Sequence, residues 1–163
     1  MNKTGLWAVV LVSAVFAAGC SSTGGSKGGA AGGDGAGVST EAYGSVGLTA
    51  DQLQQAENRT IYFDLDQSEV PPRYYDVLRA QALYLIDNPD MTLTVEGHCD
   101  ERGSREYNIA LGERRANAVT RFLEAEGVAA GRVNAISYGE ERPADPGQGE
   151  SAWALNRRAI VLY

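Results

Sequence analysis

An aspartate and an arginine in this sequence are suited to hold a small molecule that carries both charges. Asp100 lies in a polar stretch, residues 97–103, and Arg115 lies on the helix expected to follow it. A carboxylate accepts hydrogen bonds from an ammonium group, whereas a planar guanidinium binds a carboxylate in a bidentate manner, so the pair matches a zwitterion. From the residues alone, a structural ion pair between Asp100 and Arg115 is the favoured interpretation, because such pairs outnumber ligand sites.

The helix expected over residues 106–126 decides which side chains share a direction. Asn108 and Arg115 are seven positions apart in the sequence, about two helical turns, so they point nearly the same way. Arg114 is rotated from Arg115 by about 100° and is expected to face elsewhere. Residues 63–69 are the second place where polar side chains gather at the end of a predicted strand.

Hydrophobic spacing and turn residues indicate the elements that position these side chains. Strands are predicted over 60–63, 92–97, 133–138 and 159–163, and helices over 71–88 and 106–126, with a short helix after Thr49 and another around Trp153. The order is β-α-β-α-β-(short α)-β. It predicts an α/β domain, an α+β sandwich in which helices pack on one sheet.

The first fifty residues have a different character from the rest. Residues 6–18 form an uncharged run of 13 residues, too short to span a bilayer and typical of a signal peptide. Small residues then lead to Cys20, and this resembles the bacterial lipobox, in which the cysteine is acylated. Gly, Ser and Ala dominate residues 21–50, which are expected to be disordered. We expect a signal peptide over 1–19, a lipidated Cys20 with a tether over 20–50, and one domain over 51–163.

Composition narrows the classes of function. The net charge is −7, which argues against a nucleic-acid binder, because that function needs a basic footprint. Two cysteines and one histidine exclude a disulfide framework, a four-cysteine zinc site and most multi-histidine metal chemistry. We therefore expect no metal and no cofactor.

A resemblance to a known family is carried by residues 95–103 (VEGHCDERG) and 106–119 (EYNIALGERRANAV). They resemble the OmpA-like domain family and, within it, the branch of peptidoglycan-associated lipoproteins. The flanking segments 62–66 (YFDLD), 137–143 (SYGEERP) and 156–159 (NRRA) agree with it. The resemblance covers residues 60–163 and implies a mixed four-stranded sheet with helices packed on it.

This resemblance implies a non-enzymatic protein that binds peptidoglycan non-covalently through meso-diaminopimelate in the stem peptides. In that family an aspartate after the second strand and an arginine on the next helix hold the charged groups of the ligand. Here these positions are Asp100 and Arg115. The implied contacts also include Asn108, Asp66, Ser68, Arg102 and His98.

The resemblance also implies a location and partners. Acyl chains on Cys20 would anchor the chain in outer-membrane lipid, and Ser21 favours the outer over the inner membrane, with the domain facing the periplasm. TolB and other proteins of the Tol system are implied partners, and TolB competes for a surface that overlaps the wall site. The implied function is to tether the outer membrane to the cell wall.

The sequence departs from the family pattern in three places. Cys99 stands where Ala or Thr is usual and is expected to be a small core residue without a redox function. Gly112 replaces a common Ser, and residues 67–70 differ from the usual loop, which affects the contacts expected from that loop.

Three other functions stay open. A wall hydrolase would use Glu96 and Asp100 as a carboxylate pair or His98 as a general base, although the predicted domain, residues 51–163, has no G-x-S-x-G elbow. A module that mainly binds other proteins is the second. An OmpA-like lipoprotein outside the Tol system is the third.

Overall fold

A computed structural model describes residues 42–163 of the protein. The elements in chain order are β1 (Ala42–Tyr43), β2 (Leu48–Thr49), α1 (Ala50–Leu53), α2 (Ala56–Arg59), β3 (Thr60–Tyr62), the 3₁₀ turn η1 (Pro72–Tyr74), α3 (Tyr75–Asp87), β4 (Leu93–His98), α4 (Arg105–Ala125), β5 (Val133–Gly139), α5 (Glu150–Asn156) and β6 (Arg158–Leu162). From β3 onwards, this confirms the predicted order of strands and helices.

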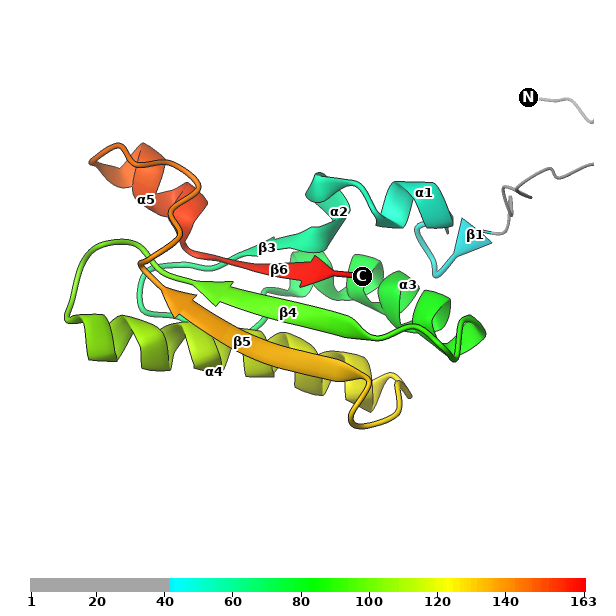
Figure 1. Cartoon of the computed structure of the whole chain (residues 1–163). Coiled ribbons are helices and arrows are strands. Elements are labelled where there is room, and N and C mark those ends of the chain that lie inside the picture. Colours follow the sequence, from blue (N-terminus) through cyan, green and yellow to red (C-terminus); the bar gives the residue numbers. More distant parts are fainter. Residues whose placement is uncertain (1–41) are drawn as a thin grey trace, which may run out of the picture. The chain divides into compact units, whose positions relative to one another are not determined.

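Four of the strands form one mixed sheet in the order β3-β6-β4-β5. Strands β4 and β5 run parallel, as expected for strands joined by the helix α4, whereas β6 pairs antiparallel with both β3 and β4. The long helices α3 and α4 lie on one face of this sheet (Figure 1). The expected mixed sheet with helices packed on it is therefore confirmed.

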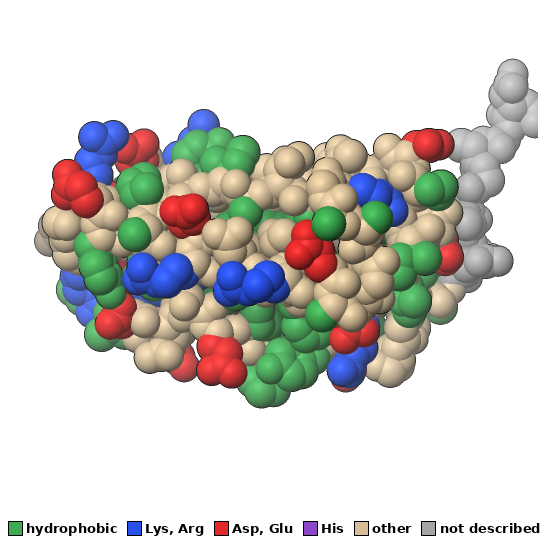
Figure 2. Space-filling view, turned by 90° about the horizontal axis from the view of Figure 1, so that it is seen from below, with side chains coloured by type: hydrophobic (Ala, Val, Ile, Leu, Met, Phe, Trp, Pro, Cys, Tyr) green, Lys and Arg blue, Asp and Glu red, His purple; other side chains and the backbone are tan. Residues whose placement is uncertain are grey.

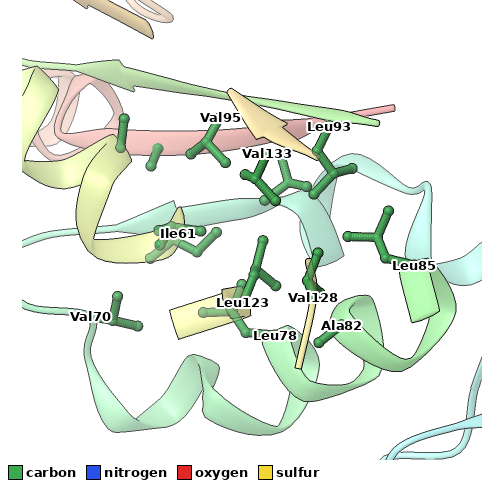
Figure 3. Close-up of a cluster of buried hydrophobic side chains, with 14 of the residues drawn as sticks. Ile61, Val70, Leu78, Ala82, Leu85, Leu93, Val95, Leu123, Val128 and Val133 are labelled. Atoms are coloured by element: carbon green, nitrogen blue, oxygen red, sulfur yellow. The ribbon is translucent and has the colours of Figure 1, made fainter. Parts of the chain in front are cut away.

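The core lies between the sheet and the two long helices. Strand β4 contributes Leu93 and Val95, which alternate with the partly exposed Thr94, as expected for a strand buried on one face. Figure 3 shows these side chains directed toward those of the helices. The cluster also contains Ile61, Val70, Leu78, Ala82, Leu85, Ala116, Val119, Leu123, Val128, Val133, Ala159 and Val161.

Two glycines let α4 approach the sheet at backbone distance. A Cβ added to Gly97 would lie 1.9 Å from the carbonyl oxygen of Gly112, and one added to Gly112 would lie 2.4 Å from Oγ of Ser137. The Ser137 hydroxyl also donates to the carbonyl oxygen of Ile109 at 2.7 Å. This close contact fixes the height of α4 above the end of β4, where the polar residues begin.

Local signals fix both ends of α4. Ser104 is the N-cap, and its side chain accepts a hydrogen bond from the backbone N–H of Tyr107 at 3.2 Å. The helix ends before Gly127, whose φ of 107° is a conformation that glycine adopts readily. The predicted helix, 106–126, is therefore confirmed to within one residue at each end.

The expected tether extends too far toward the C-terminus. Residues 42–49 form a small hairpin, and Tyr43 in it is buried with its ring against that of Tyr84, at 5.3 Å between ring centroids. Packing of Tyr43 and Leu48 in the cluster around Tyr84 thus offsets the ordering cost of a segment whose composition is otherwise that of a flexible chain. Residues 42–50 therefore belong to the folded part of the chain, although the domain was predicted to begin at residue 51.

The remaining predictions for the N-terminal region concern the signal peptide, Cys20 and the tether up to residue 41. They lie outside the described residues. Within residues 42–163, no helix has the length and apolar character needed to cross a membrane.

A methyl group on Gly97 is expected to lower the free energy of unfolding by about 3 kcal/mol, because α4 must move away from β4 to accommodate it. Urea unfolding of Gly97→Ala would measure this loss. The control is Ala135→Val, which adds bulk at an exposed position of β5 and should change stability by about 0.5 kcal/mol or less. Equal effects of the two substitutions would contradict the close packing.

Candidate functional site

A cavity of about 310 Å³ opens where β4 ends and α4 begins. Its walls come from the loop after β3, the loop after β4, the first half of α4 and the end of α5. The lining residues are Leu65, Asp66, Cys99, Asp100, Arg102, Gly103, Tyr107, Asn108, Leu111, Arg115 and Arg157. The structure therefore brings five of the predicted site residues together, namely Asp66, Asp100, Arg102, Asn108 and Arg115.

Asp100 is almost fully buried and is held by two arginines. Arg102 donates to it from Nη2 at 2.7 Å and from Nε and the backbone N–H at 3.1 Å, while Nη1 of Arg157 donates at 3.3 Å. Burial alone raises the pKa of Asp100, but the hydrogen bonds from Arg102 and Arg157 outweigh this and hold the pKa below its ordinary value. The carboxylate is therefore ionised at neutral pH.

Arg115 is fully buried on α4, and its hydrogen-bond partners are all neutral. Its guanidinium donates to the carbonyl oxygens of Gln67 and His98, each at 2.8 Å, and to that of Asp64 at 3.2 Å. It also lies over the ring of Phe63, 5.2 Å from the centroid. Burial lowers the pKa of Arg115, yet a guanidinium stays protonated in proteins. The cavity wall therefore contains a positive charge whose hydrogen bonds all go to neutral groups.

Asp100 and Arg115 line one cavity without forming an ion pair among the described contacts. The carboxylate pairs instead with Arg102 and Arg157. The simple interpretation of an Asp100–Arg115 salt bridge is therefore wrong, because two other arginines, Arg102 and Arg157, pair with the carboxylate. The predicted difference between neighbouring arginines is confirmed, since Arg114 is exposed and lies over the ring of Tyr107.

The sequence prediction missed Arg157. It follows α5 directly, and its guanidinium joins three segments by donating to the Phe63 carbonyl at 3.2 Å, to Asp100 and to Glu150 at 2.5 Å. The available signal was the pair of arginines, 157 and 158, placed immediately before an apolar strand. Because buried charges need partners, two arginines at the start of a buried strand indicate that acidic or carbonyl groups lie close to them.

Asn108 and Asp66 complete opposite walls of the cavity. The side-chain amide of Asn108 donates to the Asp100 carbonyl at 3.2 Å and to Oε2 of Glu140 at 2.5 Å. Asp66 has a φ of 58°, in the left-handed region that aspartate tolerates better than most residues, and accepts a hydrogen bond from the hydroxyl of Tyr107. The loop after β3 is thus fastened to α4 across the cavity.

Among the three arginines that line the cavity, Arg102 has the side chain most exposed to solvent. Its side chain is 33% exposed, whereas that of Arg157 is 7% exposed. Its guanidinium stacks on Trp153 of α5 at 4.2 Å from the ring centroid, and the Trp153 indole donates to Glu101 at 3.1 Å. Helix α5 therefore supports the rim of the cavity.

The structure does not bring His98 and Ser68 into this cavity. The His98 ring lies beside that of Tyr138 at 5.7 Å and is 3.5 Å from a carboxylate oxygen of Glu96. It is buried, and only its backbone carbonyl meets the site, through Arg115. Ser68 lines a separate groove with Tyr75 and other residues. The turn closed by the bond from Gln67 N–H to the Asp64 carbonyl directs the chain away before Ser68.

Cys99 is a buried residue in the cavity wall, as expected from its small size. Its thiol donates to the Asn108 carbonyl at 3.2 Å and accepts from Nη1 of Arg115 at 3.4 Å. Burial raises the pKa of the Cys99 thiol to about 11, so the thiolate is scarce at neutral pH and the sulfur is a poor nucleophile. Cys99 is therefore a packing residue of the cavity wall rather than a reactive thiol.

The surface on the side of α4 does not share the concentration of charge seen in the cavity. Figure 2, seen from the side of α4, shows acidic and basic side chains interspersed among hydrophobic ones. This face of the described domain therefore presents no continuous field of one sign. The concentration of charge at the cavity is a local feature.

Comparisons with known proteins agree with the fold and the site. A family model described as the OmpA family matches residues 62–157, more than half of the chain. This chain belongs to the OmpA family. The match runs from the end of β3 to Arg157, so it includes every residue that lines the cavity.

Relatives within the OmpA family resemble the chain along most of its length. The peptidoglycan-associated lipoprotein of Pasteurella multocida is 48% identical over 117 residues, which are 72% of this chain and 77% of that protein. The peptidoglycan-associated lipoprotein of Legionella pneumophila is 41% identical over 163 residues, which cover 95% of this chain and 92% of that protein. The crystal structure of the Burkholderia pseudomallei peptidoglycan-associated lipoprotein, 43% identical, matches with a TM-score of 0.64 over 64% of this chain and 89% of that one.

Arg115→Ala is expected to lower the free energy of unfolding by about 3 kcal/mol or more, because it removes a fully buried side chain that donates to three backbone carbonyl groups. Arg114→Ala should cost about 0.5 kcal/mol or less, since that side chain is exposed. Urea unfolding of both variants measures the difference. Equal losses would show that the helix face is assigned incorrectly.

His98 is the only histidine in the chain, so its ring protons report its titration directly by NMR. Burial first, and then the charges of Arg158 and Arg142, lower its pKa to about 4. Because the folded pKa lies below the ordinary value, its contribution to stability is complete above about pH 6.5 and is lost as pH falls toward 4. An observed pKa near 6.5 would contradict the buried placement.

Proposed function

We propose that this chain is an outer-membrane lipoprotein that binds peptidoglycan non-covalently through meso-diaminopimelate and tethers the outer membrane to the cell wall within the Tol-Pal system. In this role it contributes to envelope integrity and cell division. The observation that carries the proposal is the cavity in which two carboxylates, of Asp66 and Asp100, and three guanidinium groups meet. The names of its relatives, peptidoglycan-associated lipoproteins, support the same class of ligand.

The charges of the cavity match the free end of meso-diaminopimelate, which carries an ammonium and a carboxylate on one carbon. The Arg115 guanidinium attracts the carboxylate, because its own hydrogen bonds go to neutral carbonyl groups and leave its charge unneutralised by direct contact. Burial strengthens this attraction relative to water. Arg157 adds a second positive charge to the same wall.

The ammonium group of the ligand binds at Asp100, with Asp66 on the opposite wall. In the structure Arg102 forms an ion pair with the Asp100 carboxylate, and the ligand ammonium can displace this partly exposed side chain. The exchange replaces one cation on Asp100 with another, so the carboxylate is never left buried without a partner. Asn108 supports the Asp100 backbone and keeps the loop in position.

The proposed role is binding rather than catalysis. His98, the candidate general base of the hydrolase alternative, does not line the cavity and has a lowered pKa of about 4, and Glu96 of the alternative carboxylate pair does not line it either. The thiol of Cys99 is kept protonated by burial. Among the described residues, the lining of the cavity therefore offers charged contacts rather than an activated nucleophile.

Acylated Cys20 is the proposed anchor in the outer-membrane lipid, with the residues after it joining the anchor to the folded domain. Two or three acyl chains give stable attachment, whereas one gives only marginal binding. TolB and other Tol proteins are the proposed protein partners, with TolB competing for a surface that overlaps the wall site. Membership of the Tol system is tested by asking whether excess peptidoglycan displaces purified TolB from the chain.

Sedimentation of the purified chain with diaminopimelate-type peptidoglycan tests the wall site. Asp100→Asn and Arg115→Lys are expected to weaken binding by about tenfold or more, because each alters a buried charge contact that the ligand requires. Arg114→Ala is the matched control and should bind as the parent does. Circular dichroism of each variant separates lost binding from lost folding.

Peptidoglycan with lysine in the stem peptide is the control ligand, because lysine lacks the second carboxylate. It should bind more weakly, and equal binding would contradict the contact between Arg115 and a carboxylate. If the folded variants at Asp100 and Arg115 bind as well as the parent chain, these residues have a structural role and do not bind the ligand. No binding by the parent chain would favour a module whose partners are proteins.

A further inference from the structure

Arg102 holds the position on Asp100 that the proposed function assigns to the ammonium group of the ligand. Its guanidinium donates to both oxygens of the Asp100 carboxylate, from Nη2 at 2.7 Å and from Nε at 3.1 Å. Bidentate pairs of an arginine with a carboxylate are among the strong hydrogen-bonded contacts in proteins. A ligand that needs Asp100 therefore has to displace a cation that the chain itself supplies.

The two arginines that pair with Asp100 are held with different firmness. Arg157 is buried, and its guanidinium also donates to the Phe63 carbonyl and to Glu150. The side-chain hydrogen bonds recorded for Arg102 all go to Asp100, and its side chain is partly exposed. Arg102 is therefore the arginine that can leave, while Arg157 stays and keeps the buried carboxylate paired.

Helix α5 offers a second position for the Arg102 guanidinium. This helix lies at the end of the sheet where β4 ends (Figure 1). The guanidinium lies over the ring of Trp153, and its Nη2 is 3.7 Å from Oε2 of Glu150. The other oxygen of Glu150 accepts from Arg157 at 2.5 Å, which holds this exposed carboxylate beside the cavity. A short movement along the Trp153 ring thus takes Arg102 from a buried carboxylate to an exposed one.

We propose that Arg102 is an internal competitor of the ligand, which occupies Asp100 until an ammonium group replaces it, and that Trp153 and Glu150 receive the displaced guanidinium. This inference rests on the proposed function of the cavity. The ligand binds only those molecules in which Asp100 is open, so the apparent affinity is reduced by the fraction that Arg102 keeps closed. Arg102 and α5 therefore set how tightly the site binds.

A direct contact between Arg102 and the ligand is the alternative role. That role predicts weaker binding when the guanidinium is removed, whereas competition predicts tighter binding. The geometry favours competition, because the guanidinium directs two of its N–H groups at Asp100 and packs its face on Trp153. The sign of the change in affinity therefore separates the two roles.

Arg102→Gln in the purified full-length chain tests the proposal by sedimentation with diaminopimelate-type peptidoglycan. This variant should bind at least about threefold more tightly than the parent chain, because the competing cation is gone. Arg102→Lys should lie between the two, since an ammonium group is a point charge without the planar fork of a guanidinium. Arg105→Gln is the matched control, because it removes an exposed arginine that pairs with Glu141 outside the cavity lining, and it should bind as the parent does.

The outcomes separate this inference from the proposed function. Equal or weaker binding by the folded Arg102→Gln variant, beside a parent chain that binds, overturns the competition and leaves the proposed function standing. If neither the parent nor the variant binds, the proposed function and this inference both fail. Circular dichroism establishes folding, and if Arg102→Gln does not fold, tighter or unchanged binding by Arg102→Lys decides the question in the same way.

Discussion

The buried guanidinium of Arg115 is the contact on which the site depends. It joins the loop after β3, the end of β4 and the helix α4 through hydrogen bonds to three backbone carbonyl groups. Burying a charge is costly unless hydrogen bonds compensate it, and here the compensation comes from neutral groups. The loops are thus held in place by a residue whose positive charge has no carboxylate partner among its hydrogen bonds, so the fold and the proposed binding role depend on the same side chain.

The sequence predicted the scaffold well because period and spacing are local properties. Alternation along 92–97 located β4 to within one residue, and the helix predicted over 106–126 agrees with α4 to within one residue at each end. The seven-residue spacing correctly placed Asn108 and Arg115 on the cavity side of α4, with Arg114 outside. A helical face is fixed by geometry once the helix exists, so this part needed no tertiary information.

The partners of these side chains were not predictable in the same way. Asp100 pairs with Arg157, which lies 57 positions later and reaches it only because β6 inserts between β3 and β4. His98 was misplaced because the polar loop was expected to begin there, whereas β4 continues through it. The hairpin before α1 was missed because its composition indicated disorder, and its order depends on the contact between Tyr43 and Tyr84.

The two ends of the domain are separated along the strands of its sheet. The cavity lies where β4 ends, whereas the N-terminal hairpin packs near Tyr84 and the C-terminal Tyr163, where β6 ends (Figure 1). In a domain that tethers membrane to wall as proposed, tension therefore runs roughly along the strands. Hydrogen bonds between antiparallel strands lie perpendicular to them, so such tension loads several bonds together in shear. The hairpin lies outside the four-stranded sheet, so the packing of Tyr43 and Leu48 in the cluster around Tyr84, rather than strand pairing with that sheet, would carry the load there.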